Sequence, residues 1–326
     1  MFFSRFKSFF SSAPKSKPVP LCTAKVFFPP NEDYRYFERA AKFPFEFNAV
    51  AFSPINAWWL AESALLAYAD AAFARRRFLR EGFRAMKVFG KDSQVCFVAH
   101  TDDFIIVSFR GTEVRPRKHS DSGKPIWQDF LTDINLVLTD LNHDDRGGKV
   151  HRGFKAAFLL LWHDKGLRNY LDALRLNNRR RHKRVWFTGH SLGGALAAIA
   201  ASVYEETAGL YTIASPRVGD AAFKARITAP AYRLVNHNDL MCKIPPSLGY
   251  EHIGELKCFD ARGNLAEGAT ESDIHAKDML AQFSQLTEAV WQAWQGKEWV
   301  VPFDFIANHA PLYYAIHTWN HLVKSR

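Results

Sequence analysis

The residues with the clearest chemical potential are the pentapeptide GHSLG at positions 189–193. It satisfies the pattern G-x-S-x-G, in which a serine lies on a sharp turn between a strand and a helix. An apolar run precedes it and the alanine-rich segment 195–201 follows it. Glycines two residues on either side of the serine prevent side chains from colliding across such a turn. The pattern predicts that Ser191 is a nucleophile; the alternative is a serine that only caps the following helix.

A serine nucleophile needs a base and an orienting carboxylate. In proteins with this turn the three residues follow in the order serine, acid, histidine. Asp239 ends the strand-like run YRLVNHND and would project from the carboxyl edge of the sheet, where ligands of open α/β folds bind. Asp220, in the loop SPRVGD, is the rival acid, although an N-cap explains it more simply.

Five histidines that follow Ser191 are candidates for the base: His252, His275, His309, His317 and His321. His309 lies in a loop just before a predicted helix, which is the usual position of a mobile base. His252 lies close behind Asp239, at the start of a strand-like run. The residues alone favour His309 and leave the alternatives open.

Helical and strand-like patterns alternate from residue 45 onward, which indicates an α/β fold with a mostly parallel sheet. Residues 55–79 are predicted to form one long amphipathic helix, and residues 150–174 are also helical in pattern. Short runs bounded by turn formers predict five strands, at 94–100, 103–109, 184–189, 209–215 and 231–237. One or two further helices are expected in the segment Ser272 to Gln295.

The composition is that of a packed protein: of 326 residues, 48% are hydrophobic and 14% aromatic. The net charge of +10 favours anionic surfaces, but the basic runs lie in predicted loops and no aromatic RNA-binding signature accompanies them. We therefore expect no nucleic-acid partner. The four cysteines have no metal-binding spacing and are expected to be unpaired, with a Cys242–Cys258 pair as the alternative.

The first 20 residues contain no apolar core long enough for a signal peptide. Five phenylalanines would nevertheless share one side of a helix there, a pattern typical of a lipid interface or a targeting segment: Phe2, Phe3, Phe6, Phe9 and Phe10. Docking on the protein's own core and disorder are the alternatives. We expect an N-terminal segment and linker at 1–44, a main domain at 45–326, and a cytoplasmic or peripherally membrane-associated location in preference to secretion.

The motifs in their order along the chain resemble the class 3 lipase family, the fungal-type triacylglycerol lipases and their bacterial relatives. The resemblance spans Asn56 to Tyr314 and includes IIVSFRGTE, VHRGFKAAF, FTGHSLGGALAAIAA, YTIASPRVGDAAF, RLVNHNDLMCKIPPSLGYEHIGE and NHAPLYYA. It implies an α/β-hydrolase fold with a mostly parallel central sheet, flanking helices and a lid.

Carried over to this sequence, the resemblance implies Ser191 as nucleophile, Asp239 as acid and His309 as base. It also implies an oxyanion hole formed by Thr112, of the motif FRGT, and Leu192. His309 would take the serine proton while Asp239 holds the imidazole and stabilises its charged form. The local match around His309 is short, because Asn308 stands where an aspartate is frequent.

The lid of the relatives follows the RGT-like motif, which here corresponds to Glu113–Leu131. Its second half carries apolar residues at helical spacing: Ile126, Trp127, Phe130 and Leu131. A basic loop beside this stripe would suit a lipid surface; an ordinary buried helix face is the alternative.

The expected activity is hydrolysis of lipid carboxylic esters, as in a triacylglycerol lipase, through an acyl-enzyme and without a metal or organic cofactor. Phospholipase A1 and short-chain or feruloyl esterase activities use the same groups and remain alternatives. A non-catalytic lipid- or protein-binding module is a remote one. The expected partner is the lipid ester, with contact to a lipid surface through the lid and the Phe-rich N-terminus.

Overall fold

The computed structural model describes residues 14–112, 137–141, 144–176, 182–266, 268–269 and 304–326. Several segments for which the sequence made a prediction lie outside these ranges. They are the Phe-rich segment, the helices expected between Ser272 and Gln295, and the lid residues Ile126, Trp127, Phe130 and Leu131.

A seven-stranded sheet forms the centre of the described chain, in the order β1-β2-β3-β6-β7-β8-β9. Its strands are β1 (Ala85–Lys91), β2 (Gln94–His100), β3 (Phe104–Phe109), β6 (Arg184–His190), β7 (Thr207–Ile213), β8 (Ala231–Asn236) and β9 (Glu255–Phe259). β1, β2 and β3 are antiparallel neighbours, whereas β3, β6, β7, β8 and β9 run parallel. All five predicted strands are confirmed, and parallel pairing brings their carboxyl ends to one edge.

Both faces of this sheet are covered, because successive side chains of a strand point to opposite sides. On β3, Ile106 packs into one hydrophobic cluster while Ile105 and Val107 pack into the other. On β6, Trp186 and Phe187 divide in the same way. Strands buried on both faces read as continuous apolar runs, which is why these two were easy to predict.

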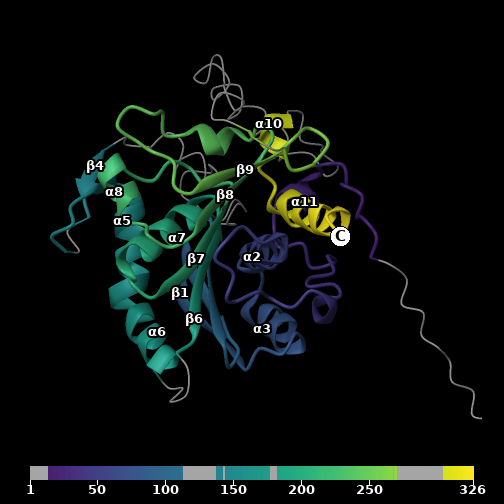
Figure 1. The fold of residues 1–326 in the computed structure, drawn as a ribbon, viewed down its shortest axis with the longest axis horizontal. Helices are drawn as coiled ribbons and strands as arrows, with labels where there is room; N and C mark the ends of the chain where they lie inside the picture. Colours follow the sequence, from purple (N-terminus) through teal and green to yellow (C-terminus); the bar gives the residue numbers. More distant parts are fainter. Residues whose placement is uncertain (1–13, 113–136, 142–143, 177–181, 267, 270–303) are drawn as a thin grey trace, which may run out of the picture.

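Helices form a layer on each side of the sheet, as Figure 1 shows. One layer contains α2 (Pro54–Leu66), α3 (Ala71–Arg80) and α11 (Pro311–Lys324). The other contains α5 (Arg152–Leu159), the π-helix Leu160–Asp164, α6 (Leu167–Leu176), α7 (Leu192–Val203) and α8 (Ala221–Ala225). No helix among the described residues is both long and apolar enough to cross a membrane.

The remaining elements are short. They are α1 (Ala24–Phe27), the 3-10 helices Ala40–Lys42 and Leu240–Lys243, the hairpin of β4 (Leu138–Asp140) and β5 (Lys149–His151), and α10 (Asp304–Ala307).

The prediction of one helix over residues 55–79 is wrong, because two helices, α2 and α3, occupy this stretch. Asp70 separates them by capping α3: its Oδ1 accepts hydrogen bonds from the N–H groups of Ala72, at 2.8 Å, and Phe73, at 3.3 Å. An aspartate that satisfies the free donors of a helix start stabilises a new helix there. The apolar periodicity continues across the break and concealed it.

The described part of the N-terminal segment is packed against the main domain. Glu62 of α2 is fully buried and accepts hydrogen bonds from Tyr34 Oη at 2.7 Å, Trp58 Nε1 at 2.6 Å and the N–H of Phe37. Burial raises the pKa of this carboxyl group above its usual value. Tyr36, Phe37 and Phe43 belong to the same hydrophobic cluster as α2. The domain boundary expected at residue 44 stays a prediction, but residues 36–43 share this core.

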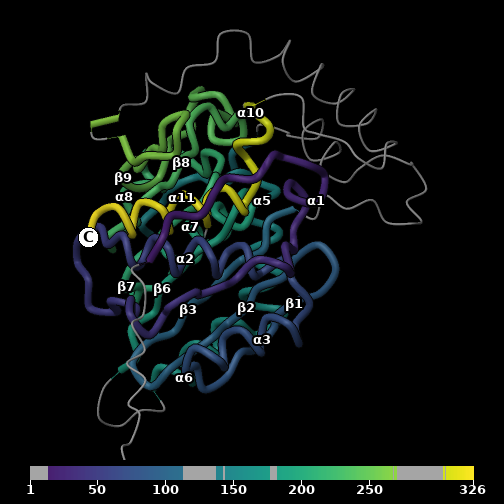
Figure 2. The backbone as a smooth tube through the Cα atoms, turned by 90° about the vertical axis from the view of Figure 1, so that its right-hand side faces the viewer, coloured from purple at the N-terminus to yellow at the C-terminus, as the bar shows by residue number. Residues whose placement is uncertain are grey.

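Residues 15–20 lie along α11, and Figure 2 shows the N-terminal segment beside this helix. The side chain of Asn320 accepts from the N–H of Lys17 at 2.6 Å and donates to its carbonyl oxygen at 2.8 Å. Trp319 Nε1 donates to the carbonyl of Lys15 at 2.9 Å, and Tyr313 Oη to that of Pro20 at 2.7 Å. These bonds fix an otherwise extended segment to the helix that follows His309.

Replacing Asn320 with alanine should release this segment. Two hydrogen bonds from its side chain to the backbone of Lys17 would be lost, so the free energy of unfolding should fall by about 1–3 kcal/mol, and trypsin should cut faster after Lys15. Chemical denaturation and timed proteolysis measure both effects. Asn320→Asp, which keeps the acceptor and loses the donor, should fall between wild type and Asn320→Ala. Unchanged proteolysis in both variants would contradict the role of these bonds.

Candidate active site

Ser191 lies on a strained turn between β6 and α7. Its φ of 57° and ψ of −126° lie in a region that side chains rarely adopt, and its N–H donates to the carbonyl of Ile213 at 2.9 Å. A Cβ atom on Gly189 would lie 2.2 Å from the carbonyl oxygen of Gly193, and one on Gly193 would lie 2.1 Å from that of Phe109. The glycines of the motif are therefore required sterically. Ser191 makes no side-chain capping bond to α7.

The two residues predicted for an oxyanion hole flank this turn. Leu192 is the first residue of α7, so its N–H has no acceptor within the helix. The chain at Gly111 passes close to the turn, since a Cβ there would lie 3.2 Å from Cβ of Ser191. Thr112 comes next, and its hydroxyl is buried without a hydrogen-bond partner among the described residues. The segment that leads to Thr112 and the start of α7 thus both lie next to Ser191.

Asp239 and His309 are in direct contact. His309 Nδ1 lies 3.1 Å from Oδ1 and 3.0 Å from Oδ2 of Asp239. Asp239 follows β8, is fully buried, and accepts from the N–H of Met241 at 2.9 Å. With Nδ1 donating to the carboxylate, Nε2 of His309 is the nitrogen left to accept a proton. Its side chain is 16% exposed. Ser191 Oγ makes no hydrogen bond with any described residue, and such bonds are often loose without substrate.

Two further residues hold this pair and were missed by sequence reasoning. Tyr314, on α11, donates its hydroxyl to Asp239 Oδ2 at 2.7 Å and accepts from the N–H of Asn236 at 2.9 Å. Burial, and then the charge of Asp239, raise the pKa of Tyr314, which keeps its hydroxyl protonated as a donor. The side chain of Asn236 donates to the carbonyl of Asn308 at 3.1 Å. No local pattern distinguishes Tyr314 from other aromatic residues of its helix.

The other acid and base candidates lie elsewhere. Asp220 caps α8 by accepting from the N–H of Phe223 at 2.8 Å, which confirms the simpler interpretation of that residue. His317 and His321 lie on α11, beyond its first turn, and His252 precedes β9. His275 lies outside the described residues.

His190, inside the motif, makes contacts that the sequence pattern does not indicate. Its ring is buried and contacts the ring of His309, with the ring centroids 4.6 Å apart. Its nitrogens lie 2.9 Å from Tyr68 Oη and 2.9 Å from the carbonyl oxygen of His309. Tyr68, just after α2, had no sequence signal.

Among the described residues, no group of three or more histidine, cysteine, aspartate and glutamate side chains is arranged to hold a metal ion. All four cysteines are buried and free, as expected.

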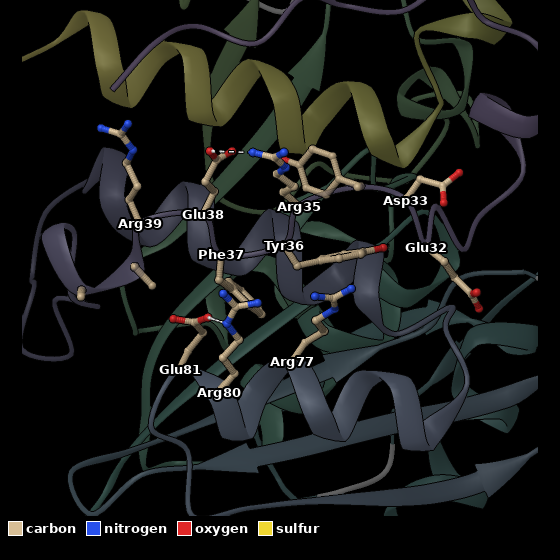
Figure 3. Close-up of a pocket in the computed structure, with 13 residues that line it drawn as sticks. Glu32, Asp33, Arg35, Tyr36, Phe37, Glu38, Arg39, Arg77, Arg80 and Glu81 are labelled. Carbon is tan, nitrogen blue, oxygen red and sulfur yellow. Dashed lines mark ion pairs between the residues drawn. The ribbon is translucent and has the colours of Figure 1, made fainter. Parts of the chain in front are cut away.

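A polar cavity of about 470 Å³ lies between α3 and the loop at 32–41 (Figure 3). It is lined by four arginines and four carboxylates: Arg35, Arg39, Arg77, Arg80, Glu32, Asp33, Glu38 and Glu81. Ion pairs join Arg35 to Glu38 at 3.9 Å and Arg80 to Glu81 at 3.8 Å. Its charges balance, and neither Ser191 nor His309 lines it. This cavity is separate from the candidate active site.

Comparison with known proteins agrees with this geometry. Residues 106–249, which include Thr112, Ser191 and Asp239, match the family model described as lipase (class 3). In this region, which carries most of the candidate site, the chain is similar to the class 3 lipases. The central sheet with its two helical layers is the α/β-hydrolase fold, as predicted.

The curated relatives match only part of this chain. A lipase of Rhizomucor miehei is 36% identical over 146 residues, which are 40% of this chain and 39% of the relative. Secreted mono- and diacylglycerol lipase 1 of Fusarium solani is 38% identical over 101 residues, 29% of this chain and 30% of the relative. A crystal structure of a mutant MDLA from Penicillium cyclopium matches 77% of this chain and 92% of that chain, with a TM-score of 0.52 and 22% identity. The chain spans less than half the length of both curated relatives.

One expectation is wrong. A cytoplasmic or peripherally membrane-associated location was favoured over secretion, but the Fusarium solani relative is named as secreted. The expectation rested on the missing apolar core in the first 20 residues, and this feature does not decide where a member of the family is found.

Buried histidines should make the stability of this protein depend on pH. Burial lowers the pKa of His317 to about 4, and it lowers the pKa values of His190 and His252 below the usual range. Below about pH 6.5 the unfolded chain then binds more protons than the folded chain. The contribution of these histidines to the free energy of unfolding is therefore fully present above that pH and falls as the pH drops toward 4. For His317 the loss approaches about 3 kcal/mol.

Urea unfolding at several pH values between 4.5 and 7.5 (about 0.5 apart) measures this dependence. His317→Gln should weaken the acid-side fall in the free energy of unfolding. His163→Gln, at an exposed position, is the matched control and should keep the wild-type slope. Equal slopes for the two variants would contradict the assignment to His317.

Proposed function

We propose that this chain is a serine hydrolase of lipid carboxylic esters, with Ser191 as nucleophile, His309 as base and Asp239 as the acid that orients it. The contact of His309 Nδ1 with Asp239, at 3.0 Å, beside a serine on a strained turn, is the observation that supports it most. The contact leaves the other imidazole nitrogen available to a proton.

In the proposed reaction, His309 Nε2 takes the proton of Ser191 Oγ while this oxygen attacks the ester carbonyl. The resulting oxyanion accepts hydrogen bonds from the N–H of Leu192 and from the N–H and hydroxyl of Thr112. The C–O bond of the ester then breaks, and the alcohol leaves with the proton from His309. Water attacks the acyl-serine through the same base, which releases the fatty acid and restores Ser191.

Asp239 and Tyr314 lower the free energy of the imidazolium form of His309. The carboxylate faces the charged ring directly, and the bonds from Met241 and Tyr314 keep it from turning away. The strained backbone of Ser191 needs no rearrangement at the moment of attack, so the geometry is prepared before the substrate binds.

For the substrate we propose triacylglycerol and related glycerol esters. The Fusarium solani relative is named for mono- and diacylglycerols, which supports the same chemical class. Contact with a lipid surface through Ile126, Trp127, Phe130 and Leu131 or through the Phe-rich N-terminus stays a prediction, because these residues lie outside the described ranges.

Ser191→Ala should abolish hydrolysis of tributyrin and of p-nitrophenyl esters, with kcat falling by about 10⁴-fold or more, because the attacking oxygen is removed. Ser202→Ala is the matched control: Ser202 lies on the same helix and its hydroxyl only donates to the carbonyl of Ile199, at 2.8 Å. Titrimetric rates on tri-, di- and monoacylglycerol and phospholipid emulsions assign the preferred ester. Undiminished turnover by Ser191→Ala would refute the proposal.

The hydroxyl of Thr112 has a separate test. Thr112→Val keeps the side-chain shape and loses the donor, so kcat should fall by about 10²-fold while KM changes little, because the bond forms chiefly in the transition state. Thr112→Ser keeps a hydroxyl and should retain most of the activity. Steady-state kinetics on a soluble ester separate the two constants. If the valine and serine variants were equally active, only the N–H of Thr112 would remain as a donor.

A further inference from the structure

Both nitrogens of the His190 ring are engaged, although the ring is only a neighbour of the proposed nucleophile. Nδ1 lies 2.9 Å from Tyr68 Oη, and Nε2 lies 2.9 Å from the backbone oxygen of His309. The residue is 3% exposed. Three segments that are far apart in the sequence therefore meet at one imidazole.

The chemistry of the partners fixes the direction of these hydrogen bonds. A backbone carbonyl only accepts, so Nε2 of His190 must donate to His309. Burial, and then the proximity of His309, lower the pKa of His190, which keeps its ring neutral. A neutral ring carries a single N–H, so Nδ1 must accept and Tyr68 must donate its hydroxyl proton. Tyr68 thereby selects the tautomer that can hold the backbone of His309.

Tyr68 also lies against the segment that leads to Thr112. A Cβ on Gly111 would lie 2.1 Å from the Tyr68 hydroxyl oxygen and 2.5 Å from the carbonyl oxygen of His190. Because Gly111 has no side chain, the chain passes directly over both groups before it reaches Thr112. The tyrosine hydroxyl thus contacts the oxyanion segment and the ring beside the nucleophile at once.

We propose that Tyr68 and His190 are positioning residues that lock three parts of the site together: the segment Gly111–Thr112, the turn at Ser191 and the loop of His309. This inference rests on the proposed function, in which these parts supply the oxyanion donor, the nucleophile and the base. Asp239 holds the side chain of His309, and His190 holds its backbone, so the base is fixed at two points.

The two-point hold has a specific consequence for the reaction. In acylation His309 takes the proton of Ser191 and gives it to the leaving alcohol; in deacylation it takes a proton from water and returns it to Ser191. Displacements near 1 Å at such a site cost about 10²-fold in rate. The rings of His190 and His309 are 4.6 Å apart, so a second charge on His190 would oppose the charge that His309 gains. A neutral His190 avoids this repulsion while it holds the loop.

Tyr68→Phe keeps the ring and removes the hydroxyl that donates to Nδ1. We expect kcat on p-nitrophenyl butyrate to fall by about 10-fold or more and KM to change by less than about 2-fold, because the reacting groups and not the binding surface lose alignment. Tyr211→Phe is the matched control: its hydroxyl is also buried and accepts one hydrogen bond, from the N–H of Ser53 at 3.0 Å, away from the site. Its kcat should stay near the wild-type value. Thermal unfolding of each variant verifies that it is folded.

A second comparison depends on His190 itself. Glutamine carries an acceptor oxygen and a donor nitrogen that can replace Nδ1 and Nε2, whereas leucine carries neither. His190→Gln should therefore keep at least about 10-fold more of the wild-type kcat than His190→Leu. Adding Tyr68→Phe to His190→Leu should change kcat by less than about 2-fold, because a linked pair is not additive. The comparison of His190→Gln with His190→Leu still tests the positioning role if Tyr68→Phe does not fold.

The outcomes separate two kinds of failure. If Ser191→Ala abolishes hydrolysis but Tyr68→Phe keeps the kcat of Tyr211→Phe, the positioning role is overturned and the proposed function stands. Equal kcat values for His190→Gln and His190→Leu, or additive losses in the double variant, overturn it as well. If the wild type shows no hydrolysis that depends on Ser191, the proposed function fails and the positioning role with it.

Discussion

A fully buried carboxyl group organises the carboxyl edge of this sheet. A carboxylate inside a protein must be hydrogen-bonded, because its transfer from water is otherwise very costly. Asp239 meets this condition through the N–H of Met241, the hydroxyl of Tyr314 and the imidazole of His309. These donors come from the 3-10 helix at Leu240–Lys243, from α11 and from the loop before α11. Satisfying one side chain therefore fixes where two elements lie relative to β8.

The helical layer formed by α2 and α11 serves the core and the site together. α2 buries Glu62, which anchors the loop at residues 34–37, and leads directly to Tyr68, which contacts His190. α11 carries Tyr314 on one side and receives residues 15–20 on another. The two helices pack against each other in Figures 1 and 2. Their packing therefore links the N-terminal segment to the surroundings of Ser191 through the tertiary structure alone.

Local patterns predicted the elements whose burial shows in consecutive residues. β3 and β6 are buried on both faces and read as short apolar runs. β1 was not predicted, because this antiparallel strand at the edge of the sheet alternates buried, half-buried and exposed residues. The break between α2 and α3 was missed because the apolar periodicity continues across it, and a single aspartate that caps α3 is a weaker sequence pattern than this periodicity. The wrong preference about location came from the lack of an apolar core in the first 20 residues, which the secreted relative contradicts.

The sequence by itself predicted the turn at Ser191, because Gly189 is needed to avoid the carbonyl of Gly193 within the same motif, whereas Gly193 is needed to avoid the distant Phe109. It also indicated the order of serine, acid and histidine, and the structure brings Asp239 and His309 within 3.0 Å. The tertiary structure decided which other side chains hold these groups. Tyr68 and His190 are 122 positions apart, and Tyr314 and Asp239 are 75 apart. Hydrogen bonds over such separations exist only after helices have packed on the sheet, so no local pattern records them.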